Sequence, residues 1–244
     1  MKAPVAAQRR LLDLQAADNR ILQANRAIQT LPQQARLAEL ERLSAAARAE
    51  YGGASGELEQ ARLEISRIEA DVETVAAREK RDRERLASSS STKDIQGLES
   101  ELASLATRRS TLEDAELEVM ERVEGIEATL AEIATRRDDL ATEERLLVAE
   151  RDAQRGTLER QREAAASERA AIAAEVPADL LALYERQRER YGIGAALLQR
   201  GISLGSNVAL TAEDLDAIRR ADPEDVVLCP DSSCILVRTE ESGL

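Results

Sequence analysis

Apolar residues recur at alternating steps of three and four along most of the first 176 residues, with charged residues between them. The series is most regular from Ile95 to Leu140, where only Arg109, Glu116 and Arg137 interrupt it. A sustained repeat of about 3.5 residues is typical of a left-handed coiled coil. The pattern therefore predicts a mainly α protein built on a long coiled-coil helical hairpin.

Breaks in this pattern predict three helices, at about 4–30, 33–86 and 94–174. Leu31-Pro32 ends the first helix, because proline lacks an N–H group and disfavours α geometry in the residue before it. The serine-rich run Ser88–Thr92 interrupts the series again and predicts a hairpin tip at about 87–93. Ser91 or Thr92 is expected to cap the third helix.

The short tip requires the second and third helices to run antiparallel. The third helix, with about 81 residues at roughly 1.5 Å each, is as long as the first two together. The first helix therefore either continues along the far end of the third after a kink at Pro32, or folds back to make a three-helix base. Leu31-Pro32-Gln33 lacks the Gly or Asn of a reversal, which favours the kink. Asp18 and Asn25 interrupt the first helical series and either fix its register or lie at its edge.

The chain changes character after Val176-Pro177. A short amphipathic helix and a glycine-containing linker are expected over 177–194. From 195 to 244, the short apolar runs Ala195–Leu198, Val226–Leu228 and Ile235–Val237 alternate with turns, and Thr211–Arg220 has the pattern of one capped helix. This predicts a small β-rich module at the C-terminus.

Composition narrows the function classes. The formal net charge is −13, and the chain contains no histidine, tryptophan or phenylalanine. The negative net charge disfavours sequence-independent binding of nucleic acid. The absence of histidine removes the commonest general base and the commonest metal ligand. No cluster of side chains suggests catalysis, so a non-enzymatic protein is expected. No apolar stretch approaches the roughly 18 residues of a membrane span, and no signal-type segment opens the chain, which predicts a cytoplasmic location.

The order of the elements resembles bacterial coiled-coil hairpin proteins that end in a four-cysteine zinc ribbon. The segments that carry the resemblance are the Ser/Thr-Lys-Asp tip, Leu112–Glu121, Leu180–Arg186, Cys229-Pro230 and Ile235–Arg238. Members of that family look like adaptors without catalytic activity, and roles in binding proteins or nucleic acid have been proposed for them.

The resemblance also implies two Cys-x-x-Cys ligand pairs, which here fall on Ser203, Ser206, Cys229 and Ser232. Cys234 lies two residues further, at a position that is not a ligand in the family. Serine is not a usual zinc ligand, so no zinc and no other cofactor are expected. A Cys229–Cys234 disulfide is the alternative, although a reducing cytoplasm disfavours it. Without metal, the module must depend on the adjoining helix or on its own apolar residues: Val208, Leu210, Leu215, Ile218, Val226, Leu228, Ile235 and Val237.

Basic residues gather near the tip, at Arg78, Lys80, Arg81, Arg83, Arg85 and Lys93. They form either a surface for an acidic partner or phosphate backbone, or a solvated helix end with i,i+4 ion pairs, which the interleaved acids favour. The serines of the tip serve as a modification loop or, as we favour, a turn. We therefore expect a monomeric or weakly self-associating adaptor that binds protein partners through its tip and C-terminal module. Binding of RNA through the basic tip is the alternative.

Overall fold

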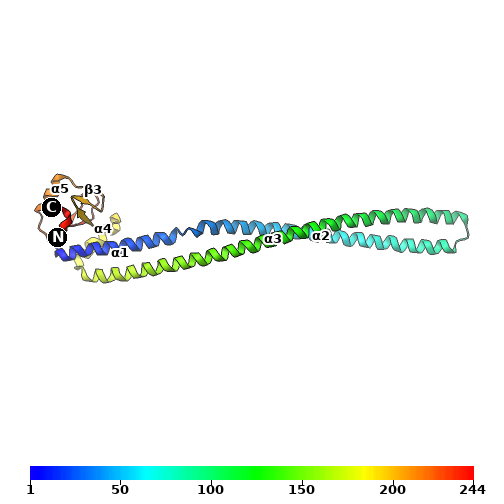
Figure 1. Cartoon of the computed structure of the whole chain (residues 1–244), viewed down its shortest axis with the longest axis horizontal. Helices are drawn as coiled ribbons and strands as arrows, with labels where there is room; N and C mark the ends of the chain where they lie inside the picture. Colours follow the sequence, from blue (N-terminus) through cyan, green and yellow to red (C-terminus); the bar gives the residue numbers. More distant parts are fainter. The chain divides into compact units, whose positions relative to one another are not determined.

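The computed structural model describes residues Met1 to Leu244, and its three long helices follow the predicted pattern (Figure 1). They are α1 (Val5–Gln29), α2 (Gln33–Ser88) and α3 (Thr92–Glu175). The tip is shorter than predicted, because α2 continues to Ser88 and the Ile95 amide donates to the Ser91 carbonyl at 3.0 Å. None of the helices combines the length and the apolarity that crossing a membrane requires.

The chain forms two compact units. One is the hairpin unit, Ala35–Val148. The other combines Met1–Gln34 with Ala149–Leu244. This division differs from the one drawn from the sequence, because the chain's first residues share a hydrophobic core with its last ones.

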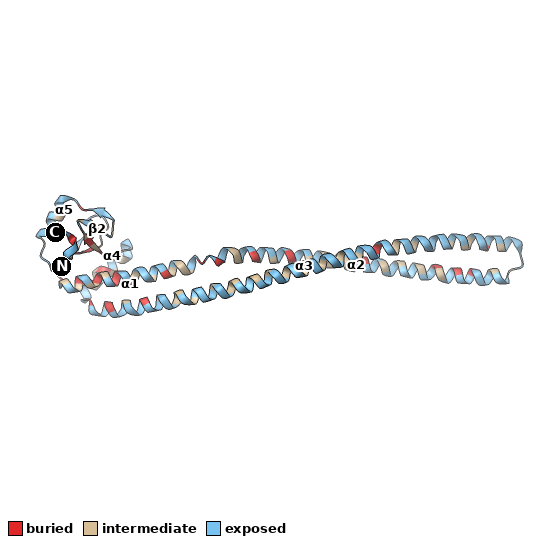
Figure 2. Cartoon of the chain, in the orientation of Figure 1, coloured by how far each residue is buried: buried red, intermediate tan, exposed pale blue.

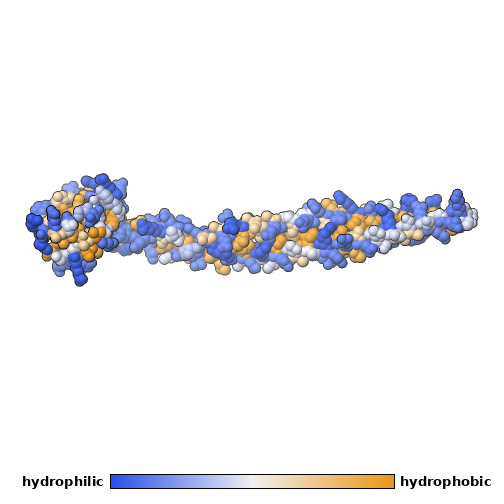
Figure 3. Space-filling model, turned by 90° about the horizontal axis from the view of Figure 1, so that it is seen from above, coloured by the Kyte–Doolittle hydropathy of each residue, from blue (hydrophilic) through white to orange (hydrophobic).

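In the hairpin unit, α2 and α3 lie side by side and run antiparallel (Figure 1). The buried positions belong to the predicted apolar series with its repeat of about 3.5 residues, which we call the seam, and in Figure 2 they recur at intervals along the two helices. These residues are Leu40, Ala47, Ala61, Val75, Leu98, Val119 and Ile133. Ion pairs such as Arg62–Glu127 at 2.7 Å flank the seam. Some large side chains, including Leu63, Leu117 and Leu146, stay exposed, and Figure 3 shows hydrophobic patches between charged residues along the helices.

We call α1, the part of α3 from Ala149 onward and α4 (Ala178–Tyr191) the helical base. Here α1 runs antiparallel to the end of α3, with Arg20 paired to Glu168 at 2.9 Å. The first helix therefore continues along α3, as the kink at Pro32 predicted, and does not fold back. The base buries a shared core of Leu11, Leu14, Ile172, Val176, Leu180 and Tyr184.

The C-terminal module, Ala195–Leu244, contains one sheet with the strand order β3-β2-β1-β5-β4. Its strands are β1 (Ala195–Gln199), β2 (Ile202–Ser203), β3 (Val208–Ala209), β4 (Val227–Leu228) and β5 (Ile235–Val237). The central pair β1–β5 is parallel, and the other pairs are antiparallel. Helix α5 (Ala212–Arg220) begins after Thr211, whose hydroxyl accepts from the Asp214 amide at 3.1 Å, and a short 3-10 turn, η1 (Glu240–Ser242), follows the sheet.

Candidate functional site

The C-terminal module docks on the helical base through one face of its sheet. Ala195, Ile235 and Val237 point into the core of the base, while Ala196 and Leu236, one residue along each strand, enter a second core inside the module. Successive residues of a strand face opposite sides, so the parallel β1–β5 pair is buried on both. The helical base thus covers one face of the module's sheet.

Two residues expected in the module core are exposed instead. Val208 is 48% exposed and Leu228 is 43% exposed. Both lie on the outermost strands of the sheet, β3 and β4, where no further strand or helix covers them. The apolar pattern identified the strands but could not tell central strands from edge strands.

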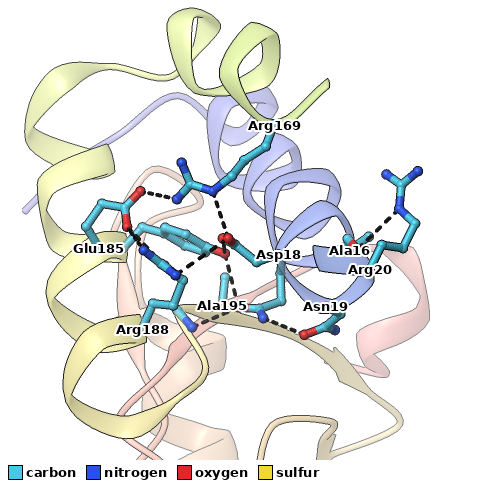
Figure 4. A network of polar contacts seen from close by, with 11 residues as sticks. Ala16, Asp18, Asn19, Arg20, Arg169, Glu185, Arg188 and Ala195 are labelled. Atoms are coloured by element: carbon cyan, nitrogen blue, oxygen red, sulfur yellow. Dashed lines mark hydrogen bonds and ion pairs between the residues drawn. The ribbon is translucent and has the colours of Figure 1, made fainter. Parts of the chain in front are cut away.

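A polar network joins the module to the base, and Figure 4 shows it. Tyr184 on α4 is fully buried, and its hydroxyl donates to the Asp18 carboxylate at 2.7 Å. The side-chain oxygen of Gln15 accepts from the backbone N–H groups of Gly194 at 2.8 Å and Ala195 at 3.3 Å. Gln15 and Tyr184 therefore fix the point where the chain enters β1.

Asp18 occupies one of the polar positions in the first helical series. Arg169 donates to its carboxylate at 2.7 Å and also pairs with Glu185, while Arg188 lies 3.6 Å from the same carboxylate (Figure 4). Burial and the hydrogen bond to Asp18 raise the pKa of Tyr184 well above its usual range. The network thus connects α1, α3 and α4 through the Asp18 carboxylate.

The first residues of the chain also join the module. The Ala3 amide donates to the Glu224 carbonyl at 2.8 Å, and the Val226 amide donates to the Met1 carbonyl at 3.0 Å. The Gln8 amide group donates to the Ala3 carbonyl at 2.9 Å and the Glu224 carbonyl at 3.2 Å. The segment before α1 is therefore held by backbone hydrogen bonds to the loop that leads into β4.

Arg238, just after β5, binds the loop that receives this segment. Its guanidinium donates to backbone carbonyls of Ala221 at 3.1 Å, Asp222 at 2.6 Å and Asp225 at 2.6 Å. One side chain thereby ties the end of α5 and the following loop to the sheet. The sequence signalled Arg238 only as part of the resemblance.

The residues at the expected metal-ligand positions do come together. The Ser206 hydroxyl lies 4.0 Å from the Cys229 sulfur, and the Ser203 hydroxyl accepts from the Gly205 amide in the same turn as Ser206. The Ser232 hydroxyl is also 3.1 Å from the sulfur of Cys234. Both cysteines are buried free thiols, so the structure does not contain the alternative disulfide.

The environment of the two thiols differs. Burial acts to raise the pKa of Cys229, but hydrogen bonds from Ser203, Ser232 and nearby backbone amides lower it below the ordinary thiol value. Burial raises the pKa of Cys234. The turn around Cys229 is therefore organised to donate hydrogen bonds to a sulfur atom.

This donor set does not fit a structural zinc ion. Such a site uses four thiolate or imidazole ligands, whereas the four positions here supply one thiol and three hydroxyls. No three side chains of His, Cys, Asp or Glu meet anywhere in the chain as a metal-binding group. The four expected ligand positions lie close together, but their side chains are suited to hydrogen bonding and not to zinc binding.

Half of the basic residues near the tip have carboxylate partners inside the hairpin unit. Arg78 pairs with Glu101 and lies 3.9 Å from Asp82. Arg85 lies 3.5 Å from Asp82. These contacts match the ion-paired interpretation of the tip for Arg78 and Arg85.

The acidic partners are themselves seam residues. Glu79, which bonds Arg83 at 2.9 Å, and Asp82 are only 2% and 4% exposed. One oxygen of Asp82 is buried without a hydrogen-bond partner. Of the predicted basic patch, Lys80, Arg81 and Lys93 are exposed and form no ion pair.

Comparison with known proteins identifies the family to which this fold belongs. A family model described as a CT398-like coiled-coil hairpin domain matches residues 14–192. The chain belongs to the CT398-like hairpin family. The match covers the hairpin unit, α4 and most of the helical base, and it stops before the C-terminal module.

Relatives extend the likeness over nearly the whole chain. The uncharacterized protein Rv2229c of Mycobacterium tuberculosis (strain ATCC 25618 / H37Rv) is 33% identical over 248 residues, covering 98% of both chains. A solved structure from Mycobacterium smegmatis is 32% identical, covers 98% of this chain and 100% of its own, and has a TM-score of 0.88. The structure of CT398 from Chlamydia trachomatis, at 18% identity, 95% and 97% coverage and a TM-score of 0.67, shows the same fold.

Within this family fold, the residues that sequence reasoning missed are the ones that join separate segments. Gln8 and Gln15 gave no signal, because glutamines are common on exposed helix faces and their partners in the module lie more than 170 residues away. Tyr184 offered a clue, as one of only three aromatic residues in the chain. Large aromatic side chains with a buried hydroxyl usually have a hydrogen-bond partner.

Proposed function

We propose that the protein is a non-enzymatic, cytoplasmic adaptor that binds protein partners through the open edge of its C-terminal module. The observation that carries this proposal is the hairpin β2–β3. Strand β3 pairs only with β2, and Ile202, Leu204 and Val208 are 40%, 44% and 48% exposed. An open strand edge with apolar side chains is a surface to which an extended segment of another protein can add a strand.

The charge of the module supports a protein partner over nucleic acid. Between Ala195 and Leu244, acidic residues outnumber basic ones, and no aromatic side chain is available to stack on a base. An acidic surface repels a phosphate backbone and complements a partner segment that carries lysine or arginine. We therefore propose that the occupant of the edge is a basic, extended peptide segment.

The tip is a second, smaller contact in this proposal. Lys80, Arg81 and Lys93 are exposed and unpaired, so they remain available to an acidic surface. The same three exposed cations could bind the phosphate backbone of RNA, and they are the reason for RNA binding as the alternative function. Arg78, Arg83 and Arg85 already have carboxylate partners and contribute little to either.

Site-specific photo-crosslinking in cells tests the proposal with the full chain. A photoreactive amino acid replaces Val208 on the module edge, Arg81 near the tip or Glu57 on an exposed face of α2, which is the control. We expect RNase-resistant protein adducts from position 208 that are absent from position 57. Substitution Leu204→Asp, at an exposed site, should reduce them. RNase-sensitive adducts confined to position 81 would refute the adaptor proposal in favour of RNA binding.

A truncation at Gly194 is a poorer test. Ala195, Ile235 and Val237 fill the core of the helical base, and their removal would expose Leu11 and Tyr184. Loss of a partner could then reflect a damaged base. Surface substitutions on the β2–β3 hairpin avoid this ambiguity.

A further inference from the structure

We infer that the C-terminal module folds without a structural metal, and that docking on the helical base supplies the stability that zinc supplies in a four-cysteine ribbon. This inference goes beyond the adaptor proposal and does not depend on any partner. It rests on the donor set at the ligand positions, the packing of the two turns, and the contacts between the sheet and the base.

The side chains at the expected ligand positions are poor zinc ligands. Ser203, Ser206 and Ser232 surround Cys229 with hydroxyl groups, which are neutral and hold zinc poorly. Cys234 adds a second thiol beside Ser232, but two thiols without histidine or carboxylate neighbours fall short of four strong ligands. The cluster is satisfied by its own hydrogen bonds.

The two turns that would carry the ligands touch each other directly. A Cβ atom added to Gly205 would lie 2.6 Å from the Cys234 sulfur and 3.2 Å from the Ser232 hydroxyl. The Gly205 amide also lies 3.3 Å from the Ser203 hydroxyl that accepts its hydrogen bond. The packing of Gly205 against Cys234 and the contact between Ser206 and Cys229 therefore connect the turns where a metal ion would otherwise do so.

The base replaces the remaining function of the metal, which is to hold a small module in one conformation. A module of this size buries little apolar surface alone. Here Ala195, Ile235 and Val237 are at most 1% exposed, because the base covers them. The Gln15 side-chain oxygen accepts from the Gly194 amide in the linker and from the Ala195 amide at the start of β1. The segment Met1–Ala3 adds backbone hydrogen bonds to the loop just before β4. The module is therefore completed by residues outside it.

Two variants separate these contributions. Gly194→Ala places a Cβ about 2.4 Å from the Tyr184 ring and should loosen docking without touching the serine–cysteine cluster. Its matched control is Gly125→Ala on α3, where no atom lies within 4 Å of the added Cβ. The triple variant Ser203→Cys, Ser206→Cys, Ser232→Cys restores four thiolates around the position of Cys229.

The measurements are metal content by mass spectrometry and hydrogen exchange of the β1 and β5 amides. Purified wild-type protein should hold no stoichiometric zinc, and a chelator should leave its exchange unchanged. Gly194→Ala should speed exchange in β1 and β5 about tenfold or more, whereas Gly125→Ala should not. The triple variant should bind one zinc per chain, and zinc should restore slow exchange when that variant also carries Gly194→Ala.

Each opposite result counts against the inference. Stoichiometric zinc in the wild-type protein, or faster exchange after chelation, would show that metal holds the module. Unchanged exchange in Gly194→Ala would show that the module stands without the base. If Gly194→Ala loses its helical circular dichroism, Gln15→Ala replaces it as the undocking variant, with the same expectation for β1 and β5. A triple variant that binds no zinc would show that the four positions do not converge.

Discussion

The buried hydroxyl of Tyr184 offers the most direct test of how the module is attached. Tyr184→Phe removes one oxygen atom and keeps the ring that packs against Gly194. The lost contact is the 2.7 Å hydrogen bond to Asp18, together with a longer 3.2 Å contact to Gln15. Tyr184 is the only hydrogen-bond donor to that carboxylate oxygen.

The magnitude follows from the state of the acceptor. A hydrogen bond to a charged group contributes about 1.5–3 kcal/mol, more than one between neutral groups. Asp18 keeps its 2.7 Å bond from Arg169, so its carboxylate is not left buried without a partner. We therefore expect the lower end of the range, about 1.5 kcal/mol, which corresponds to roughly a tenfold change in an equilibrium constant.

Hydrogen exchange is the appropriate assay, because the chain has two compact units and a single unfolding free energy would mix them. In Tyr184→Phe, the amides of β1, β5 and the start of α4 should exchange about tenfold faster. The amides of the hairpin unit should keep their wild-type rates. This contrast places the effect within one unit.

Tyr191→Phe is the matched control, because Tyr191 lies on the same helix, is 45% exposed and forms no side-chain hydrogen bond. It should leave exchange unchanged. Equal effects of the two substitutions, or a change below about twofold in Tyr184→Phe, would refute the view that the Tyr184–Asp18 contact holds the module on the base.

Three further predictions concern other contacts. Arg238→Met should speed exchange of the amides at the end of α5 and in the loop 221–226, because several backbone carbonyls lose their donor; Arg220→Met serves as the control. Asp82→Leu should stabilise the hairpin unit by about 1 kcal/mol or more, because it replaces a buried carboxylate of which one oxygen has no hydrogen-bond partner; a lower melting temperature by circular dichroism would contradict this. The hydrogen bond from Arg36 lowers the pKa of Glu143, so the pair stabilises the fold above the ordinary glutamate pKa of about 4.3 and loses this contribution as the pH falls through the lowered value. Denaturation of Glu143→Gln should lack this component of the acid sensitivity, and identical pH profiles would contradict the assignment.

The helices could be predicted from the sequence because their determinants are local. The repeat from Ile95 to Leu140 defines a seam, and Pro32 interrupts the chain where α1 ends. The module was harder, because its architecture depends on pairing between distant segments. Nothing local shows that β1 lies parallel to β5, or that Met1–Ala3 joins the loop before β4. Apolar patterning identified most strands and could not assign their order.

The candidate site shows the same difference at the level of side chains. The four ligand positions were predicted together, and they meet in space because the turns that carry them are adjacent. At the tip, the spacing of three and four residues extends to Glu79 and Asp82, which are buried, but the charge pattern alone could not show which arginines pair with them. Arg83 and Arg85 pair with carboxylates of α2 itself, whereas Arg78 also pairs with Glu101 on α3, a partner that only the fold supplies.

The positions of the stabilising contacts leave little of the module's sheet free for partners. The base covers one face of the β1–β5 pair, the second core covers the other, and Met1–Ala3 occupies the neighbourhood of β4. The β2–β3 edge has no such neighbouring segment. Because Leu204 and Val208 are exposed there, a polar substitution at either should weaken binding while the exchange of β1 and β5 stays slow. Binding and stability are therefore separable by experiment: variants of the edge act on the partner, whereas variants around Tyr184 act on the fold.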